Sequence, residues 1–99
     1  MSIRRIWQRP ETVPIWAESK VNGVLADPSE DVLLTLTNPS GTVVLNAVTM
    51  VKSSTGLYVY YWTSSSDSVV GWYKAKAKFQ DGTGGDAKVT IEYGGFELQ

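Results

Sequence analysis

Two stretches of sequence decide the fold: GLYVYYWT at residues 56–63 and GWYKAKAKF at residues 71–79. Successive side chains of a β-strand point to opposite faces, so the first stretch places Tyr58, Tyr60 and Trp62 together. The second stretch places its three lysines on one face and its apolar residues on the other, namely Tyr73, Ala75, Ala77 and Phe79. This pattern predicts two strands at the centre of an antiparallel β-sandwich, where large rings fill the space beside small residues.

The composition excludes several kinds of chemistry. The chain has 99 residues, which is the size of one domain, and it contains neither cysteine nor histidine. Disulfides, thiolate nucleophiles, imidazole bases and the usual zinc and copper ligands are therefore absent. The net charge of −1 gives no overall attraction to nucleic acid, and no apolar run approaches the ~20 residues of a membrane span. We expect a protein without cofactors that is not an enzyme and has no nucleic-acid or membrane partner.

Residues 1–11 differ in character from the rest of the chain. They combine arginines with large apolar residues and show no clear period; the candidate contact residues among them are Arg4, Arg5, Ile6, Trp7 and Arg9. Two interpretations remain open, a loosely packed terminus and an arm that a partner orders. Since tryptophan and arginine are enriched at interface hot spots, we expect residues 1–11 to form an arm and residues 12–99 the domain. Removal of residues 1–9 is expected to leave the domain folded.

Further strands are predicted before the first of the two central stretches. Residues 12–21 alternate apolar and polar side chains, but Pro14 cannot donate to a ladder, which places this strand at a sheet edge or beside a bulge. Residues 31–37 read as a strand with Val32, Leu34 and Leu36 facing inward. The turn signal NPSG at residues 38–41 predicts a hairpin between this strand and the stretch that follows it.

The C-terminal strand has an internal conflict of phase. Residues 87–92 place Val89, Ile91 and Tyr93 on one face, whereas Phe96 and Leu98 fall on the other. A shift of one residue exchanges the faces of a strand, so we expect either a bulge at Gly94-Gly95 or a crossing to the other sheet. Both alternatives keep the last two apolar residues in the core.

The spacing of strands and turns predicts an all-β fold. We count seven or eight short strands in one Ig-like antiparallel β-sandwich that has no disulfide. The Gly-x-Tyr that opens the second central stretch is typical of a tyrosine corner, in which the Tyr73 hydroxyl bonds to backbone. Tyr58 follows a similar Gly-x-Tyr and is the alternative.

A set of turn and core motifs carries a family resemblance. The motifs are Asp27-Pro28, the NPSG turn, STGLYVY at residues 54–60, GWY at residues 71–73, DGTG at residues 81–84 and a closing FEL at residues 96–98. With them, the chain resembles the small Ig-like β-sandwich proteins encoded among the structural genes of tailed bacteriophages. The resemblance implies a structural part of a particle with no catalytic residues. Similar strands and turns also occur in bacterial Ig-like modules.

Three groups of residues are candidate binding sites. Acidic loop residues would suit calcium if two loops met, namely Asp27, Glu30, Asp31, Asp67, Asp81 and Asp86, although turns need the same residue types. A cluster of aromatic rings would suit sugar stacking, although core packing uses the same rings, namely Tyr58, Tyr60, Tyr61, Trp62, Trp72 and Tyr73. Of these, Tyr61 and Trp72 lie off the inward faces and are further candidate partner contacts. The row Lys74, Lys76 and Lys78 is typical of a solvated outer face that discourages edge pairing, with a protein contact as the second interpretation.

The sequence thus favours a non-enzymatic structural protein of a phage particle. We expect a head decoration, head-tail or tail component that is assembled in the host cytoplasm, resides in the virion, binds capsid or tail proteins and associates with itself. The alternative is a carbohydrate- or ligand-binding Ig-like module of a bacterial surface protein. Genes that flank this one would discriminate between the two.

Overall fold

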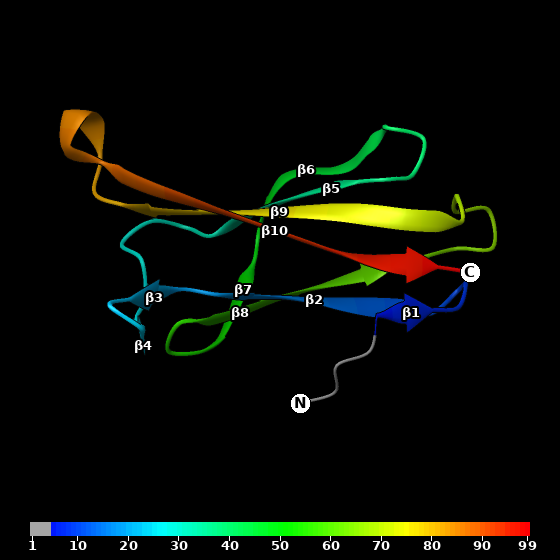
Figure 1. Cartoon of the computed structure of the whole chain (residues 1–99), viewed down its shortest axis with the longest axis horizontal. Coiled ribbons are helices and arrows are strands. Elements are labelled where there is room, and N and C mark those ends of the chain that lie inside the picture. Colours follow the sequence, from blue (N-terminus) through cyan, green and yellow to red (C-terminus); the bar gives the residue numbers. More distant parts are fainter. Residues whose placement is uncertain (1–4) are drawn as a thin grey trace.

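The computed structural model describes residues 5–99, apart from the side chain of Asp86. The elements in this part of the chain are β1 (Ile6–Trp7), β2 (Thr12–Glu18), β3 (Lys20–Val21), β4 (Val24–Leu25), β5 (Leu33–Thr37), β6 (Val43–Thr49), β7 (Val51–Ser54), β8 (Leu57–Thr63), β9 (Gly71–Asp81), the 3₁₀ turn η1 (Gly84–Asp86) and β10 (Lys88–Leu98). They form a five-stranded sheet in the order β1-β10-β9-β5-β6, a three-stranded sheet in the order β2-β8-β7, and the small β3–β4 ribbon (Figure 1).

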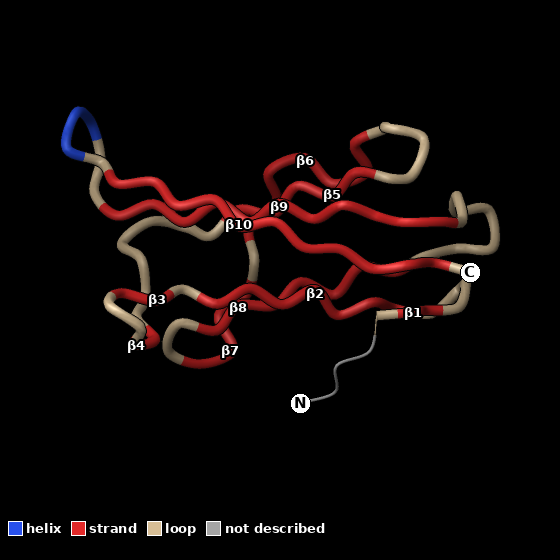
Figure 2. The backbone as a smooth tube through the Cα atoms, viewed as in Figure 1, coloured by secondary structure: helices blue, strands red, loops and turns tan. Residues whose placement is uncertain are grey.

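The two larger sheets form two layers with the core between them (Figure 2). Inward side chains of both sheets make up this core, namely Val13, Ile15, Ala17, Val32, Leu34, Leu36, Met50, Tyr58, Tyr73, Ala75, Ala77, Phe79, Phe96 and Leu98. The predicted all-β, Ig-like sandwich without a disulfide is confirmed. The predicted strand count matches the seven strands of four residues or more, and the three two-residue strands in residues 5–99 are additional to it.

The two central stretches lie in opposite sheets. β8 belongs to the three-stranded sheet and β9 to the five-stranded sheet, so their inward rings meet across the core. The ring centroids of Trp62 and Tyr73 are 5.1 Å apart, and Tyr73 stacks on Phe96 at the same distance. We call these three rings the aromatic cluster. The predicted alternation of β9 is confirmed, since Tyr73, Ala75, Ala77 and Phe79 are buried. Burial of such rings supplies much of the apolar area that a small sandwich without disulfides needs.

A tyrosine corner fixes the start of β9. The Tyr73 hydroxyl donates a hydrogen bond of 2.6 Å to the backbone carbonyl of Val69, four residues earlier. Burial raises the pKa of Tyr73 above its ordinary value, which keeps the hydroxyl protonated as a donor. The prediction for Tyr73 is confirmed, whereas the Tyr58 hydroxyl donates to the carboxylate of Asp27.

The edge position predicted for Pro14 is confirmed. β2 pairs only with β8 and forms one edge of the three-stranded sheet, where a residue without an N–H costs no ladder bond. Val13, Ile15 and Ala17 face the core as the alternation predicts.

The sequence predicts that residues 1–11 form an arm apart from the domain, but residues 5–11, the described part of this segment, pack on the domain. β1 runs parallel to the end of β10, with Ile6 beside Glu97 and Trp7 beside Leu98. The backbone carbonyl of Arg5 accepts from Glu97, and Trp7 packs against the core. The physical reason is that Trp7 packs against the core beside Leu98, so burial orders this segment within the same chain. Arg4 lies outside the described residues.

Both expectations for the phase conflict in β10 are wrong. β10 pairs with β9 in unbroken register from Lys88 to Leu98, with no bulge at Gly94-Gly95 and no crossing between sheets. Phe96 and Leu98 are in the core, but Val89, Ile91 and Tyr93 face solvent. The conflict arises because only the last part of β10 has apolar residues on its inward face.

Candidate protein-contact surface

The outer side of β9 and β10 carries an exposed mixture of lysines and apolar residues. We call it the β9–β10 face and define it by the outward side chains of Trp72, Lys74, Lys76, Lys78, Val89, Ile91 and Tyr93. The cross-strand register fixes their order, because Ile91 lies opposite Lys78 and Tyr93 lies opposite Lys76. Residues directly opposite on one face of a sheet are close enough for their side chains to touch.

The apolar members of the β9–β10 face are unusually open to solvent. Tyr93 is 79% exposed, Val89 50%, Trp72 47% and Ile91 45%. Single exposed apolar residues are normal on a protein surface, but a contiguous group ringed by polar residues is typical of an interaction site. Tyr93, with an apolar ring and a polar tip, suits an interface that is partly wet.

The lysines of this face have no acidic partner within residues 5–99. The ion pairs in that part of the chain join Lys20 to Glu18 and Lys52 to Asp27, and neither pair is on this face. Glu97 lies opposite Trp72 on the outer side of the sheet, and its carboxylate accepts a hydrogen bond from the Gln99 side chain. The face therefore carries a net positive charge, which favours an acidic partner surface.

Trp72 lies over a glycine of the neighbouring strand. A Cβ added at Gly95 would be 2.6 Å from Cζ2 of Trp72 and 2.5 Å from the backbone oxygen of Tyr73. The absence of a side chain at Gly95 thus creates the space in which the indole rests against β10. One part of the ring packs on this backbone, and 47% of Trp72 remains exposed at the end of the face.

The structure brings some of the predicted contact residues together and separates others. Ile6, Glu97 and Trp72 form one row on the outer side of the five-stranded sheet, with Ile6 50% exposed. Trp7 faces the core instead. The guanidinium of Arg9 donates to the backbone oxygens of Ser66 and Ser68, at 2.8 and 3.1 Å, so it anchors the β8–β9 loop.

Tyr61 belongs to a different surface. It lies opposite Pro14 on the outer side of the three-stranded sheet and is 62% exposed. Trp16 and Val51 are exposed on the same sheet, each opposite the buried Val59. Tyr61 and Trp72 are therefore on opposite outer faces of the sandwich and cannot contact one flat partner together.

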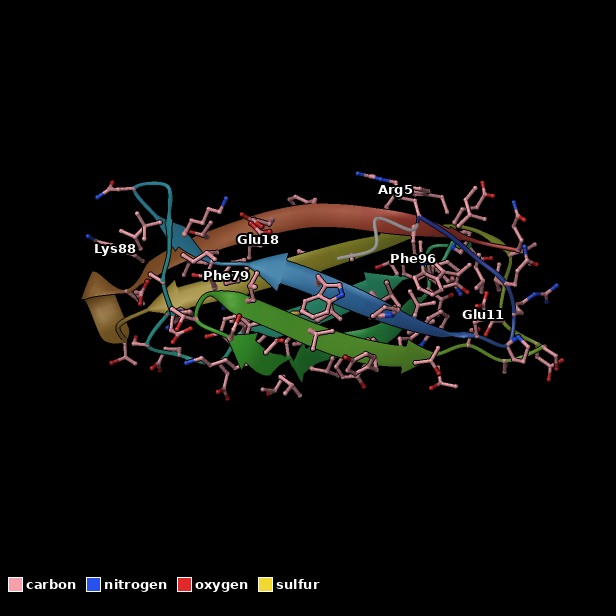
Figure 3. All side chains as sticks on the ribbon, turned by 90° about the horizontal axis from the view of Figure 1, so that it is seen from below. Arg5, Glu11, Glu18, Phe79, Lys88 and Phe96 are labelled. Atoms are coloured by element: carbon pink, nitrogen blue, oxygen red, sulfur yellow. The ribbon has the colours of Figure 1, made fainter. Side chains whose placement is uncertain are left out.

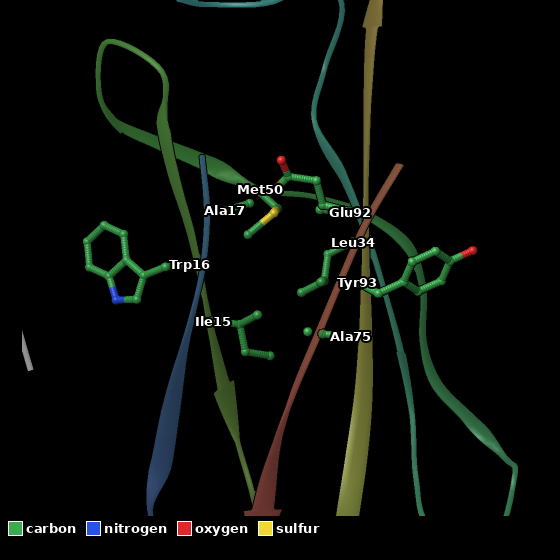
Figure 4. A pocket seen from close by; sticks show the side chains of 10 residues that line it. Ile15, Trp16, Ala17, Leu34, Met50, Ala75, Glu92 and Tyr93 are labelled. Atoms are coloured by element: carbon green, nitrogen blue, oxygen red, sulfur yellow. The ribbon is translucent and has the colours of Figure 1, made fainter. Parts of the chain in front are cut away.

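A small groove opens between β2 and β10. Its volume is about 80 Å³ and its floor is apolar, with Ile15, Leu34 and Met50 among the lining residues (Figure 4). Glu92 points toward the groove, while Trp16 and Tyr93 point away from it. A pocket for a drug-sized ligand takes ~300 Å³ or more, so this groove is too small to be a substrate site.

Two of the acidic loop residues, Asp27 and Asp81, are engaged by protein groups at different places. The Asp27 carboxylate accepts from the Lys52 ammonium, the Gly56 backbone N–H and the Tyr58 hydroxyl. The hydrogen bonds from Lys52 and then Gly56 lower the pKa of Asp27. Asp81 accepts from the backbone N–H of Ser29. Within the described residues, no group of three or more acidic, His or Cys side chains is placed to hold a metal ion, and no helix is long and apolar enough to cross a membrane.

Sequence reasoning missed the β10 half of this surface. The sequence predicts a bulge or a crossing that corrects the phase of Val89, Ile91 and Tyr93, yet these residues are exposed members of the face. The signal was present in the sequence, since their alternation is opposite to that of Phe96 and Leu98, and in an unbroken strand one of the two sets must face outward.

Comparison with known proteins gives a likeness of fold. No family model matches the chain, and no curated protein matches it. The chain is similar to part of the crystal structure of a DUF4785 family protein from Legionella pneumophila, with 14% sequence identity and a TM-score of 0.71. The match covers 97% of this chain and 26% of that one, so this chain spans about a quarter of the length of that protein.

Proposed function

We propose that this chain is a non-catalytic protein-contact module that binds an acidic partner protein through the β9–β10 face. The observation that carries the proposal is the side-by-side placement of unpaired lysines and exposed apolar residues, with Tyr93 directly opposite Lys76. Burial of the exposed rings against a partner would supply binding affinity, and the lysine charges would orient that partner. Catalysis is disfavoured because the chain has no histidine or cysteine to act as a base or nucleophile.

The setting we propose is the particle of a tailed bacteriophage. Its support is the resemblance of the turn and core motifs to phage structural proteins. The partner would then be a capsid or tail protein, and the chain would reside in the virion.

Binding to proteins encoded by adjacent genes tests both parts of this proposal. The chain is expressed with each of them, and affinity is measured for Tyr93→Ala and Lys76→Glu. Each substitution is expected to weaken binding at least ~10-fold if its residue is central to the interface. Tyr61→Ala is the matched control, since it removes an exposed tyrosine from the opposite sheet.

Two results would count against the proposal. Equal loss of affinity in Tyr61→Ala would place the contact elsewhere. Binding to immobilised glycans that depends on Trp72 and Tyr93, with no binding to a protein, would favour the alternative of a carbohydrate-binding module, because exposed rings stack on sugar faces.

A further inference from the structure

Most of one long edge of the five-stranded sheet has no strand of residues 5–99 beside it. β10 pairs with β9 along its whole length, but β1 covers it only at Glu97 and Leu98. From Lys88 to Gly95 the other side of β10 pairs with no strand of residues 5–99. Both faces of β10 are exposed from Lys88 to Gly94 as well, which leaves this part attached to the sandwich through β9 (Figure 3, where Lys88 and Phe96 lie toward opposite ends).

The backbone groups that point out of this edge follow from the bonds to the N-terminal segment. Glu97 and Gln99 donate their N–H groups to the carbonyls of Arg5 and Trp7, away from β9. Backbone groups of every second residue in a strand point to the same edge. The N–H and C=O groups of Val89, Ile91 and Tyr93 therefore point outward, where no backbone hydrogen bond within residues 5–99 uses them.

This edge lacks most of the devices that keep strands from pairing. Proteins protect edges with proline, bulges, short strands, a covering loop or charged side chains, and of these the free part of β10 has the charges of Lys88 and Glu92. The free part of β10 contains no proline, its register is unbroken, and it is eight residues long from Lys88 to Gly95. The residues Glu18–Val21 flank its inner side across a groove of about 230 Å³ and form no backbone bond with it.

We propose that a second copy of this chain pairs with β10, antiparallel and centred on Thr90. The segment Lys88-Val89-Thr90-Ile91-Glu92 is complementary to itself when reversed. About that centre, Lys88 of each copy lies opposite Glu92 of the other, Val89 lies opposite Ile91, and the two Thr90 residues face each other. Opposite charges and threonine pairs are favourable cross-strand combinations, and β-branched side chains such as those of Val89 and Ile91 fit the pleated surface of a sheet.

The backbone geometry agrees with this register. Val89 and Ile91 both point their backbone groups out of the edge, so they form hydrogen-bonded pairs across the two-fold axis, and Thr90 lies at a non-hydrogen-bonded position on it. The next registers that keep the same hydrogen-bonding positions are centred on Val89 or Ile91. They place Lys88 opposite Thr90 or Gly94, so the pairing of Lys88 with Glu92 is lost. Neither Lys88 nor Glu92 forms an ion pair with the side chains that the structure describes, so both charges are available to a second copy.

This inference goes beyond the proposed function, because it concerns the strand edge rather than the β9–β10 face and holds whether or not a different protein binds there. Pairing would join two five-stranded sheets into one continuous sheet. The two β9–β10 faces would then lie side by side on the same surface of the dimer.

Sedimentation of the full chain over a range of concentrations tests the proposal, with charge-reversed variants. Wild type is expected to form a dimer. Lys88→Glu alone places carboxylates opposite each other and Glu92→Lys alone places ammonium groups opposite each other, so each is expected to weaken the dimer about 10-fold. The double variant restores opposite charges and is expected to dimerise like wild type. An equimolar mixture of the two single variants is expected to form a mixed dimer for the same reason.

The control is Lys74→Glu, which makes the same change of charge on β9 away from the edge and is expected to leave the dimer unchanged. A wild-type chain that stays monomeric at every soluble concentration would overturn the proposal. So would a dimer that the single reversals do not weaken, a mixture that associates no better than either variant alone, or equal weakening by Lys74→Glu. Thermal melts of each variant confirm that the sandwich is folded, which is expected because Lys88 and Glu92 are both exposed.

Discussion

The two parts of β10 have opposite environments although they belong to one unbroken strand. From Phe96 to Leu98 the strand has β1 on one side, β9 on the other and the aromatic cluster beneath it. From Lys88 to Gly94 its one neighbour among the strands of residues 5–99 is β9, and it is exposed on both faces. Both parts alternate apolar and polar residues, so alternation shows that a strand has two different faces. Which face is buried depends on the elements that cover it.

The largest expected difference between the two parts is in core stability. Phe96→Ala removes a ring that is 5% exposed and stacks on Tyr73, so we expect a loss of ~3–5 kcal/mol in the free energy of unfolding. Tyr93→Ala removes a ring that is 79% exposed and should change stability by ~0.5 kcal/mol or less. Denaturant unfolding of both variants gives the comparison, and losses of similar size would show that the far part of β10 is covered after all.

The boundary between the two parts offers a pair of neighbouring glycines. A Cβ at Gly95 would meet the Tyr73 backbone oxygen and the Trp72 ring at under 3.0 Å, whereas a Cβ at Gly94 would meet nothing within 4 Å. Overpacking against backbone costs ~1–3 kcal/mol, so Gly95→Ala should destabilise the chain by about that amount. Gly94→Ala should be neutral or slightly stabilising, because alanine restricts the unfolded chain.

Thermal unfolding and tryptophan fluorescence of the two glycine variants check this expectation. Gly95→Ala should also shift the emission of Trp72, since the ring must move away from β10. If Gly94→Ala were the more damaging substitution, the assignment of which glycine faces Trp72 would be reversed.

Much of the fold could be predicted from the sequence because its strongest signals are local. The alternation of β9, the NPSG turn and the Gly-x-Tyr of the tyrosine corner each act within about ten residues, and all are found in the structure. Pro14 predicted an edge strand for an equally local reason, its missing N–H.

The candidate surface was harder to predict because it depends on coverage by distant segments. Trp72 could be assigned to an outer face from its own strand. Val89, Ile91 and Tyr93 could not be assigned without knowing that β9 is their one neighbouring strand within residues 5–99. The burial of Trp7 could not be predicted either, because it depends on contacts with Leu98 and the core, which lie far from Trp7 in the sequence.

The opposite end of the sandwich from Phe96 is held together by polar contacts, and these should respond to pH. Asp27 lies after β4, and its carboxylate ties the β7–β8 turn through Gly56 and β7 through Lys52. Because these hydrogen bonds lower the pKa of Asp27 in the folded chain, the ionised form stabilises the fold. That contribution is complete at pH above the ordinary value of 3.8 and is lost as the pH falls through the lower folded-state value.

We therefore expect Asp27→Asn to lower the melting temperature at neutral pH, with a gap to wild type that narrows below about pH 4. Asp67→Asn, which changes an exposed loop carboxylate outside this network, is the control and should follow wild type at every pH. The Gly56 amide should exchange with solvent faster in Asp27→Asn, while the Tyr73 amide beside the aromatic cluster should not. A gap between Asp27→Asn and wild type that stays constant from pH 7 to 3 would show that the charge of Asp27 contributes nothing, and that this end of the sandwich is held by packing like the other.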